Sequence, residues 1–206
     1  MIIGINATSG VIQYGYCNDQ EVFLKFISQS KEIEMLPNLI SDLIDQTNHQ
    51  PTKIFTITGP GSYTGIRVSL TVAKMIAKVY KIELLGFSLF DAYMMTHSKM
   101  INQLTILTSN SRKGSVNLQL FQSNQSKYQA ISSIRQLTIE QLSEFIGKFD
   151  VPINWHHLNG PIIAQEILQK EPLNVEFPFQ QFIQSLNQYK KYINSNESLI
   201  YSSTVF

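Results

Sequence analysis

The sequence predicts an α/β fold of two lobes, the second smaller than the first. Three observations lead to this prediction. The chain opens with three short apolar runs separated by polar turns, a pattern typical of a strand meander. Residues 54–58 form a strand-like run, and a glycine-rich turn joins it to a long helical pattern at residues 66–81. The 206 residues are enough for two small lobes, each with its own core.

Composition narrows the class of protein. Hydrophobic residues make up 43% of the chain and charged residues only 15%, where about 25% is usual. A surface so poor in charge is expected to be covered in part by a partner. The net charge of +1 provides no general basic field for nucleic acid. The single cysteine, Cys17, and the lack of a leader or long apolar run favour a cytoplasmic protein without a membrane span.

The first lobe is assigned to residues 1–99. Residues 2–5, 11–17 and 21–27 are expected to be strands joined by tight polar turns. This opening resembles that of the actin-like (ASKHA, ribonuclease-H-like) ATPases, in which an Asp at the end of the first strand handles the metal-bound phosphate. Asn6 takes that place here, and an amide lacks the charge that holds Mg²⁺. The substitution argues against ATP hydrolysis.

Two helices are predicted in this lobe. Residues 31–47 place Leu and Ile at helical spacing, as in a helix lying on a sheet. In residues 66–81, the polar side chains form one narrow row, and the apolar arc spans more than about 200°. A helix on a sheet needs roughly half of that arc. Either the neighbouring helix covers the remainder or a second protein does.

The glycine-rich turn is the segment around which this lobe is organised. Gly59, Gly61 and Gly65 are expected to allow unusual backbone angles or close approach, and Ser62 or Thr64 to cap the following helix. A helix start also favours anions. The turn is neither a Walker A loop nor a G-x-G-x-x-G loop, and a tight turn without any ligand explains it equally well. Its members are Gly59, Pro60, Gly61, Ser62, Tyr63, Thr64, Gly65 and Arg67.

These residues also carry a resemblance to a known family. The run from Gly59 to Arg67 resembles the G-P-G-S-F-T-G-L-R signature of the TsaB (YeaZ) family, the bacterial partners of TsaD in making threonylcarbamoyladenosine on tRNA. The turn from Asn110 to Gly114 resembles that family's D-A-R-x-G-E-V-Y turn without its acidic residues. The resemblance is clear over roughly the first 120 residues and thinner afterwards.

The resemblance implies a dimerisation and scaffold subunit without catalytic activity. It would form a homodimer in isolation and a heterodimer with a TsaD-like protein in the cell, supporting threonylcarbamoyl transfer to adenosine 37 of tRNA. A TsaE-like ATPase is a further candidate partner, and tRNA would be reached only through the complex. No cofactor of its own is implied, and a nucleotide would bind only at the interface with the partner. The two helices would supply the contact, and its expected residues are Leu36, Leu39, Leu43, Val68, Val72, Met75 and Val79.

The smaller second lobe is assigned to residues 100–206. Strands are expected at residues 104–108, 116–122, 128–131 and 151–155. Thr138 is expected to cap a helix at residues 139–149, and further helices are expected at residues 162–169 and 182–193.

Other chemistry is poorly supported. No histidine pair has metal-ligand spacing, and His156 and His157 are adjacent, so their side chains should diverge. Ser62 or Thr64 as a nucleophile lacks a base at a recognisable spacing. The basic row on residues 66–81 could touch phosphate or RNA, although a solvated helix face is the commoner explanation. The rival functions are an active actin-like ATPase or kinase and a homodimeric structural module.

Overall fold

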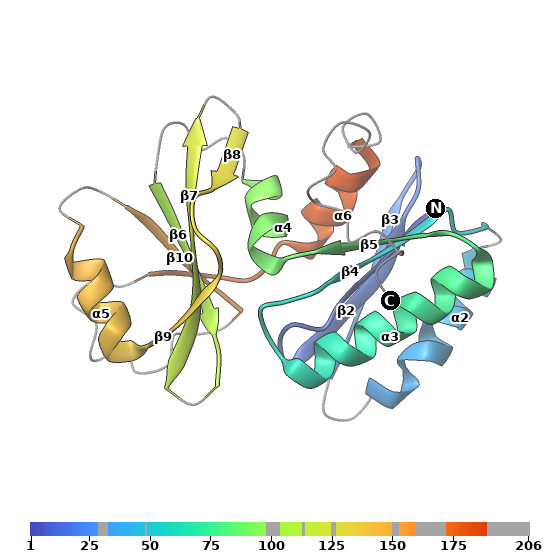
Figure 1. Cartoon of the computed structure of the whole chain (residues 1–206). Helices are drawn as coiled ribbons and strands as arrows, with labels where there is room; N and C mark the ends of the chain where they lie inside the picture. The colour runs from blue at the N-terminus through green and yellow to red at the C-terminus, as the bar shows by residue number, and fades with distance from the viewer. Residues whose placement is uncertain are drawn as a thin grey trace. The chain divides into compact units, whose positions relative to one another are not determined.

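The structure, a computed structural model, describes residues 1–28, 33–47, 49–97, 104–112, 114–124, 127–149, 153–159 and 172–188. The chain divides into two compact units (Figure 1). Unit 1 comprises Met1–Ala92 and the segment from Pro178 onward, and unit 2 comprises Tyr93–Phe177. The sequence-based division at residue 99 differs from this in two ways. The boundary falls earlier, within helix α4 (Leu89–Thr96), and the C-terminal helix α6 (Phe179–Gln188) returns to unit 1.

Unit 1 is built on a five-stranded sheet in the order β3-β2-β1-β4-β5. Strands β1, β2 and β3 form an antiparallel meander, as the sequence predicts, whereas β4 and β5 run parallel to β1. The bounds of the strands are β1 Ile2–Asn6, β2 Val11–Cys17, β3 Val22–Ser28, β4 Lys53–Ile57 and β5 Glu83–Phe87.

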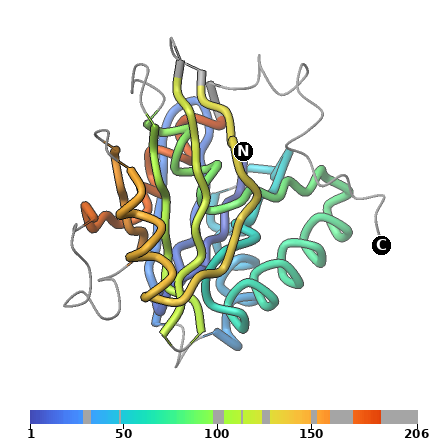
Figure 2. Tube along the Cα trace, turned by 60° about the vertical axis from the view of Figure 1, so that its left-hand side comes forward, coloured from blue at the N-terminus to red at the C-terminus, as the bar shows by residue number. Residues whose placement is uncertain are grey.

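Helices cover both faces of this sheet. Alternate residues of a strand point to opposite faces. Ile3, Ile5 and Ile54 therefore pack with the buried stripes of α2 (Leu36–Thr47) and α3 (Tyr63–Tyr80), which lie side by side in Figures 1 and 2. A short 3-10 turn, η1 (Ile33–Met35), precedes α2.

On the other face, α6 packs through aromatic rings. Phe182 lies 5.3 Å from Phe55 and 5.1 Å from Phe87 between ring centroids, both in edge-to-face geometry. Gly4 leaves room for these rings, because a Cβ there would lie 2.3 Å from the Phe55 ring and 3.1 Å from Phe179. The thiol of Cys17 donates to the carbonyl of Ile183 at 3.2 Å. This aromatic contact is why α6 belongs to unit 1 and not to the second lobe.

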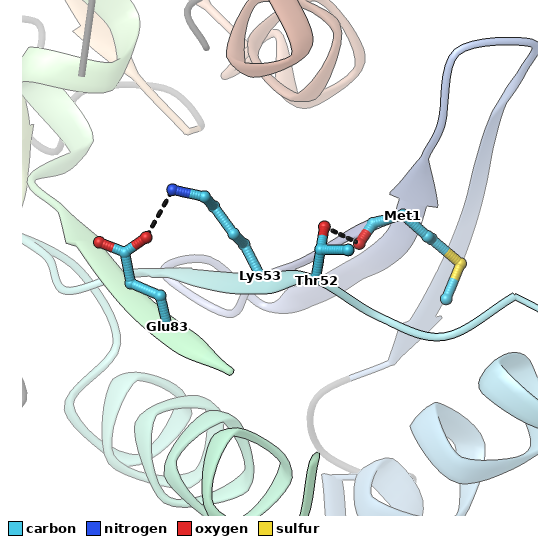
Figure 3. Close-up of polar contacts among 4 residues, drawn as sticks. All are labelled: Met1, Thr52, Lys53 and Glu83. Carbon is cyan, nitrogen blue, oxygen red and sulfur yellow. Dashed lines mark hydrogen bonds and ion pairs between the residues drawn. The ribbon is translucent and has the colours of Figure 1, made fainter. Parts of the chain in front are cut away.

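Two polar contacts close the exposed end of this sheet (Figure 3). The N–H and hydroxyl of Thr52 donate to the carbonyl of Met1, at 2.8 and 3.0 Å, and so align the starts of β4 and β1. Beside them Lys53 pairs with Glu83, directly opposite it on β5. Both side chains remain partly exposed to water, so the contribution of the pair to stability is small.

Unit 2 repeats the plan of unit 1. Its strands are β6 Leu104–Asn110, β7 Ser115–Asn124, β8 Lys127–Ala130, β9 Arg135–Thr138, β10 Asn154–Leu158 and β11 Leu173–Val175. The sheet order β8-β7-β6-β10-β11 reproduces β3-β2-β1-β4-β5, with three antiparallel strands followed by two parallel ones, and β9 extends the edge beside β7. Helix α5 (Ile139–Gly147) stands where α2 stands in unit 1. The two related sheets confirm the actin-like fold.

The predicted cap of α5 is also confirmed. The Thr138 side chain accepts the N–H of Gln141, and the Gln141 side chain accepts the N–H of Thr138, which completes a capping box. The helix predicted at residues 162–169 and the end of the one predicted at residues 182–193 lie outside the described residues. No helix in the described part of the chain is long and apolar enough to cross a membrane.

Candidate functional site: the glycine loop and the helix surface

The glycine loop connects β4 to α3 in an unusual backbone path. The Gly59–Pro60 peptide bond is cis, and φ is +112° at Gly59 and +155° at Gly61. The N–H of Leu89 donates to the carbonyl of Gly59 at 2.6 Å, which holds the loop beside the start of α4. Gly59 and Gly61 therefore adopt the unusual backbone angles that were expected of the three glycines. Gly65 differs, because it lies in the first turn of α3 with a helical backbone and is buried.

The loop is docked against the turn between β1 and β2. A Cβ on Gly61 would lie 2.3 Å from the carbonyl oxygen of Thr8, so only glycine fits. The same Thr8 oxygen accepts the N–H of Ser62 at 2.8 Å. Ser62 is then the N-cap of α3, because its hydroxyl accepts the N–H of Gly65 at 3.2 Å. Its oxygen therefore serves the helix start, which is a structural role.

Asn6 stands behind this turn at the end of β1. Its side chain is buried, and its oxygen accepts both the N–H and the hydroxyl of Thr8, at 3.1 and 2.8 Å. Its amide nitrogen donates to Gln13 Oε1 at 2.7 Å. The bond to Gln13 needs the amide, because a carboxylate has no N–H to donate, whereas a carboxylate would accept both Thr8 bonds equally well. The residue that replaces the expected Asp thus holds Thr8, and Thr8 holds the glycine loop.

Helix α3 separates its side chains into a buried and an exposed face. Small residues recur on the sheet side, where Gly65, Ser69 and Ala73 are buried and allow the helix to approach β4 closely. Val72 is on that side too, as are Leu36 and Leu43 of α2. These three were predicted as contact residues, but in this structure they are at most 3% exposed and pack in the core of unit 1.

The other predicted contact residues lie on the sides of α2 and α3 that point away from the sheet. Met75 and Val79 are 44% and 67% exposed, while Leu39 and Val68 are half-buried. Two large exposed side chains lie outside the predicted contact set, Tyr63 at 65% and Met35 at 52%. Tyr63 could have been found by extending the exposed row one helical step back from Arg67. The Arg67 guanidinium donates to the Tyr63 hydroxyl at 3.2 Å and lies 5.3 Å from its ring centroid.

A groove of about 400 Å³ runs between the two helices near their N-terminal ends. Most of its lining is apolar, and its two charged members are Glu34 and Arg67. The lining residues are Ile33, Glu34, Pro37, Tyr63, Thr64, Arg67, Val68, Thr71 and Val72.

The histidines of β10 have structural partners. Adjacent residues diverge as expected, since Nδ1 of His156 meets the Tyr93 hydroxyl at 2.6 Å and Nδ1 of His157 meets the Thr108 hydroxyl at 2.9 Å. Burial lowers the pKa of His157 to about 4, and burial together with the nearby His97 lowers the pKa of His156. Burial also raises the pKa of Tyr93 to about 12. Among the described residues, no three His, Cys, Asp or Glu side chains gather as they would around a metal ion.

Comparison with known proteins places the chain in a family. Residues 27–186 match the family model of TsaD, tRNA N6-adenosine threonylcarbamoyltransferase. YeaZ from Pseudomonas aeruginosa matches the structure with a TM-score of 0.70 at 14% identity, covering 94% of this chain and 92% of that one. A second structure, of an uncharacterised protein similar to peptidase YeaZ from Pseudomonas aeruginosa, matches with a TM-score of 0.67 at 13% identity, covering 91% of this chain and 90% of that one. A search of the curated proteins gave no match.

The family model and the solved structures both match more than half of the chain. The family match extends from the end of β3 to α6 and so includes the glycine loop, both helices of the exposed surface and all of unit 2. The chain therefore belongs to the TsaD family, tRNA N6-adenosine threonylcarbamoyltransferase, and its fold is that of YeaZ (TsaB).

Proposed function

We propose that this protein is a non-catalytic subunit that binds a TsaD-like enzyme and supports threonylcarbamoyl transfer to adenosine 37 of tRNA. Family membership and the YeaZ fold support a role in this modification. The observation that carries the partner role is the outward face of α3. There Met75 and Val79 remain exposed although the helix already buries a full stripe against its own sheet.

A role without catalysis is supported by the chemistry around Asn6. In an actin-like ATPase, this position would present a carboxylate toward a metal-bound phosphate. Here the amide oxygen already accepts two hydrogen bonds from Thr8, and the amide nitrogen is engaged by Gln13. The loop thus uses its polar groups to hold its own shape and the start of α3. Any nucleotide of the assembled complex would bind at the interface with the partner.

The exposed surface is suited to a protein contact. A stable contact buries roughly 1,600 Å² in total, with an apolar centre and a polar rim. Met75, Val79, Tyr63 and Met35 supply large apolar groups, and the groove between the helices provides a recess for a partner side chain. In isolation, the same surface would join two copies of this chain.

Co-expression with the TsaD-like protein of the same organism tests the proposal. We expect the two proteins to elute as one complex in gel filtration with light scattering. Supplied with an activated threonylcarbamoyl donor, the complex should modify unmodified tRNA, measured by mass spectrometry of its nucleosides, whereas this chain alone with the same donor should not. Val79→Glu should abolish the complex, because it places a carboxylate in the contact. Ile131→Glu is the matched control, since Ile131 is similarly exposed but lies in unit 2.

Three results would contradict the proposal. The first is modification of tRNA at the same rate with and without this chain. The second is turnover of ATP with Mg²⁺ by the isolated chain, which would favour the active ATPase instead. A wild-type homodimer that captures no TsaD-like protein would leave a structural module as the better reading.

A further inference from the structure

Strand β3 forms an open edge of the unit 1 sheet (Figure 1). It pairs with β2 on its inner side, and no other strand in the described part of the chain pairs with its outer side. The N–H of Asn18 donates to the carbonyl of Glu21 at 3.1 Å, which makes these two residues a hydrogen-bonded pair. Bonded and non-bonded pairs alternate along an antiparallel ladder, so the backbone groups of Val22, Leu24 and Phe26 point outward. An edge of this kind is a template for another strand.

A row of side chains on one face of this edge has opposite charges at its two ends. Glu21, Phe23 and Lys25 are spaced two residues apart, so they share a face. The Tyr16 hydroxyl donates to Glu21 Oε1 at 2.5 Å, and the Tyr16 ring stacks on Phe23 with centroids 5.5 Å apart. Lys25 Nζ lies 5.5 Å from the centroid of the Phe23 ring. The acid, the aromatic ring and the base therefore lie in line, and both charged residues are exposed.

We propose that β3 pairs antiparallel with β3 of a second copy, about a two-fold axis between the two Phe23 residues. In this register Lys25 of each copy lies opposite Glu21 of the other, on the same face as the two Phe23 rings. A two-fold contact repeats every pairing, so two ion pairs flank one aromatic pair. The inference is independent of the proposed function, because β3 is not part of the surface formed by α2 and α3.

The opposite face of the edge fits the same register. Val22, Leu24 and Phe26 form an apolar row there, and Phe26 is 60% exposed. In the proposed pair, Val22 of each copy lies opposite Leu24 of the other, and both residues have outward backbone groups to exchange. Phe26 lies opposite Gln20 in the β2–β3 turn of the other copy. The two apolar rows thus become one row that crosses the axis.

Charge distinguishes this register from its neighbours. A shift of the second copy by four residues aligns β3 with itself along its whole length, but it places Lys25 opposite Lys25. Like charges directly opposite each other destabilise a strand pair. A shift of two residues loses both ion pairs, and an odd shift sets outward backbone groups against inward ones. Lys25 also discourages pairing with unrelated strands, since a lysine on an edge strand is a common protection.

Charge exchange at the two ends of the row tests the pairing. Association is measured by sedimentation velocity in a Val79→Glu background, so that the helix surface does not contribute. K25E should weaken association at least about tenfold, because it sets Glu opposite Glu twice, and E21K should do the same with Lys. The chain that carries both exchanges should associate again like its parent, as should an equimolar mixture of the two single variants. Circular dichroism melts check that each variant folds.

A cross-link tests the register. F23C should form a covalent dimer under mild oxidation, because opposed Cα atoms in a non-hydrogen-bonded pair lie about 4.5 Å apart. K25C is the matched control on the same face, since the two copies of that residue would lie more than about 13 Å apart. The native Cys17 is buried and does not compete. The amides of Val22 and Leu24 should exchange with solvent more slowly as the concentration of the Val79→Glu chain rises.

Several outcomes overturn the inference. The first is a Val79→Glu chain that stays monomeric at every concentration. The second is a K25E and E21K combination that associates no better than either single variant, and the third is a K25C cross-link as fast as that of F23C. A monomer in which the Val22 and Leu24 amides are protected at every concentration would show that another segment of the chain occupies the edge. None of these outcomes bears on binding of a TsaD-like protein, so the proposed function would stand.

Discussion

Replacement of Gly61 by alanine is the most direct test of the glycine loop. The backbone at Gly61 has φ of +155°, a conformation that residues with a side chain rarely adopt. The added Cβ would lie 2.3 Å from the Thr8 carbonyl oxygen and 2.6 Å from the Thr8 Cβ. Thr8 cannot easily move away, because its carbonyl holds Ser62 and its N–H and hydroxyl hold Asn6.

The expected cost follows from these contacts. A side chain at a disfavoured backbone angle costs about 1–3 kcal/mol. Displacement of Thr8 would also weaken the Ser62 bond, worth about 1 kcal/mol. We expect Gly61→Ala to lower the free energy of unfolding by about 3 kcal/mol, which corresponds to roughly 6–12 °C in melting temperature for a chain of this size.

Thermal melts by circular dichroism measure this effect. Gly10→Ala is the matched control, because a Cβ there meets nothing within 4 Å and Gly10 lies in the same β1–β2 connection. The single tryptophan, Trp155, lies in unit 2, so its fluorescence separates unfolding of that unit from unfolding of unit 1. Equal melting temperatures for the two alanine variants would refute the argument and make the loop an ordinary flexible turn.

Three further predictions concern the packing of the core, ATP hydrolysis and the dependence of stability on pH. Val72→Glu should destabilise unit 1 by several kcal/mol because it buries a carboxylate, whereas Val79→Glu should cost no more than the association that it removes; equal melts at a dilution where the wild type is monomeric would contradict the assigned faces. The purified chain should release no phosphate from ATP with Mg²⁺ above a protein-free blank. Stability should fall as the pH drops from about 6.5 toward 4, because the unfolded chain protonates His157 before the folded one does. The loss should reach about 3 kcal/mol, and His157→Gln should reduce it in urea titrations followed by Trp155 fluorescence.

The local elements could be predicted from the sequence because their signals are local. The meander of β1 to β3, the helix after the glycine loop and the Thr138 cap depend on neighbouring residues. The placement of α6 could not be predicted in this way. Its apolar row identifies an amphipathic helix, but only the room left by Gly4 shows that Phe179 and Phe182 pack on the sheet of unit 1.

The side of α3 that faces the sheet was also hard to predict from the sequence. Its apolar arc is wide enough to contact both the sheet and a second element, and the arc alone does not show which part faces the sheet. The small residues Gly65, Ser69 and Ala73 carry the missing signal, since a helix that lies close to a sheet turns its small side chains inward. Once these small residues are placed against the sheet, the helical spacing puts Val72 on the buried side of α3 and Val79 on the exposed side. The predicted contact set therefore divides into buried and exposed members, and the contact itself stays a prediction.

A chain of hydrogen bonds and close contacts connects the glycine loop to the first turn of α3. Asn6 fixes Thr8, Thr8 fixes Gly61 and Ser62, and Ser62 caps the first turn of α3. The position and tilt of α3 on its sheet therefore depend on a buried polar chain that begins where a related ATPase would keep a carboxylate. Because α3 carries the exposed apolar row and the basic row, a shift of its first turn would move both relative to α2.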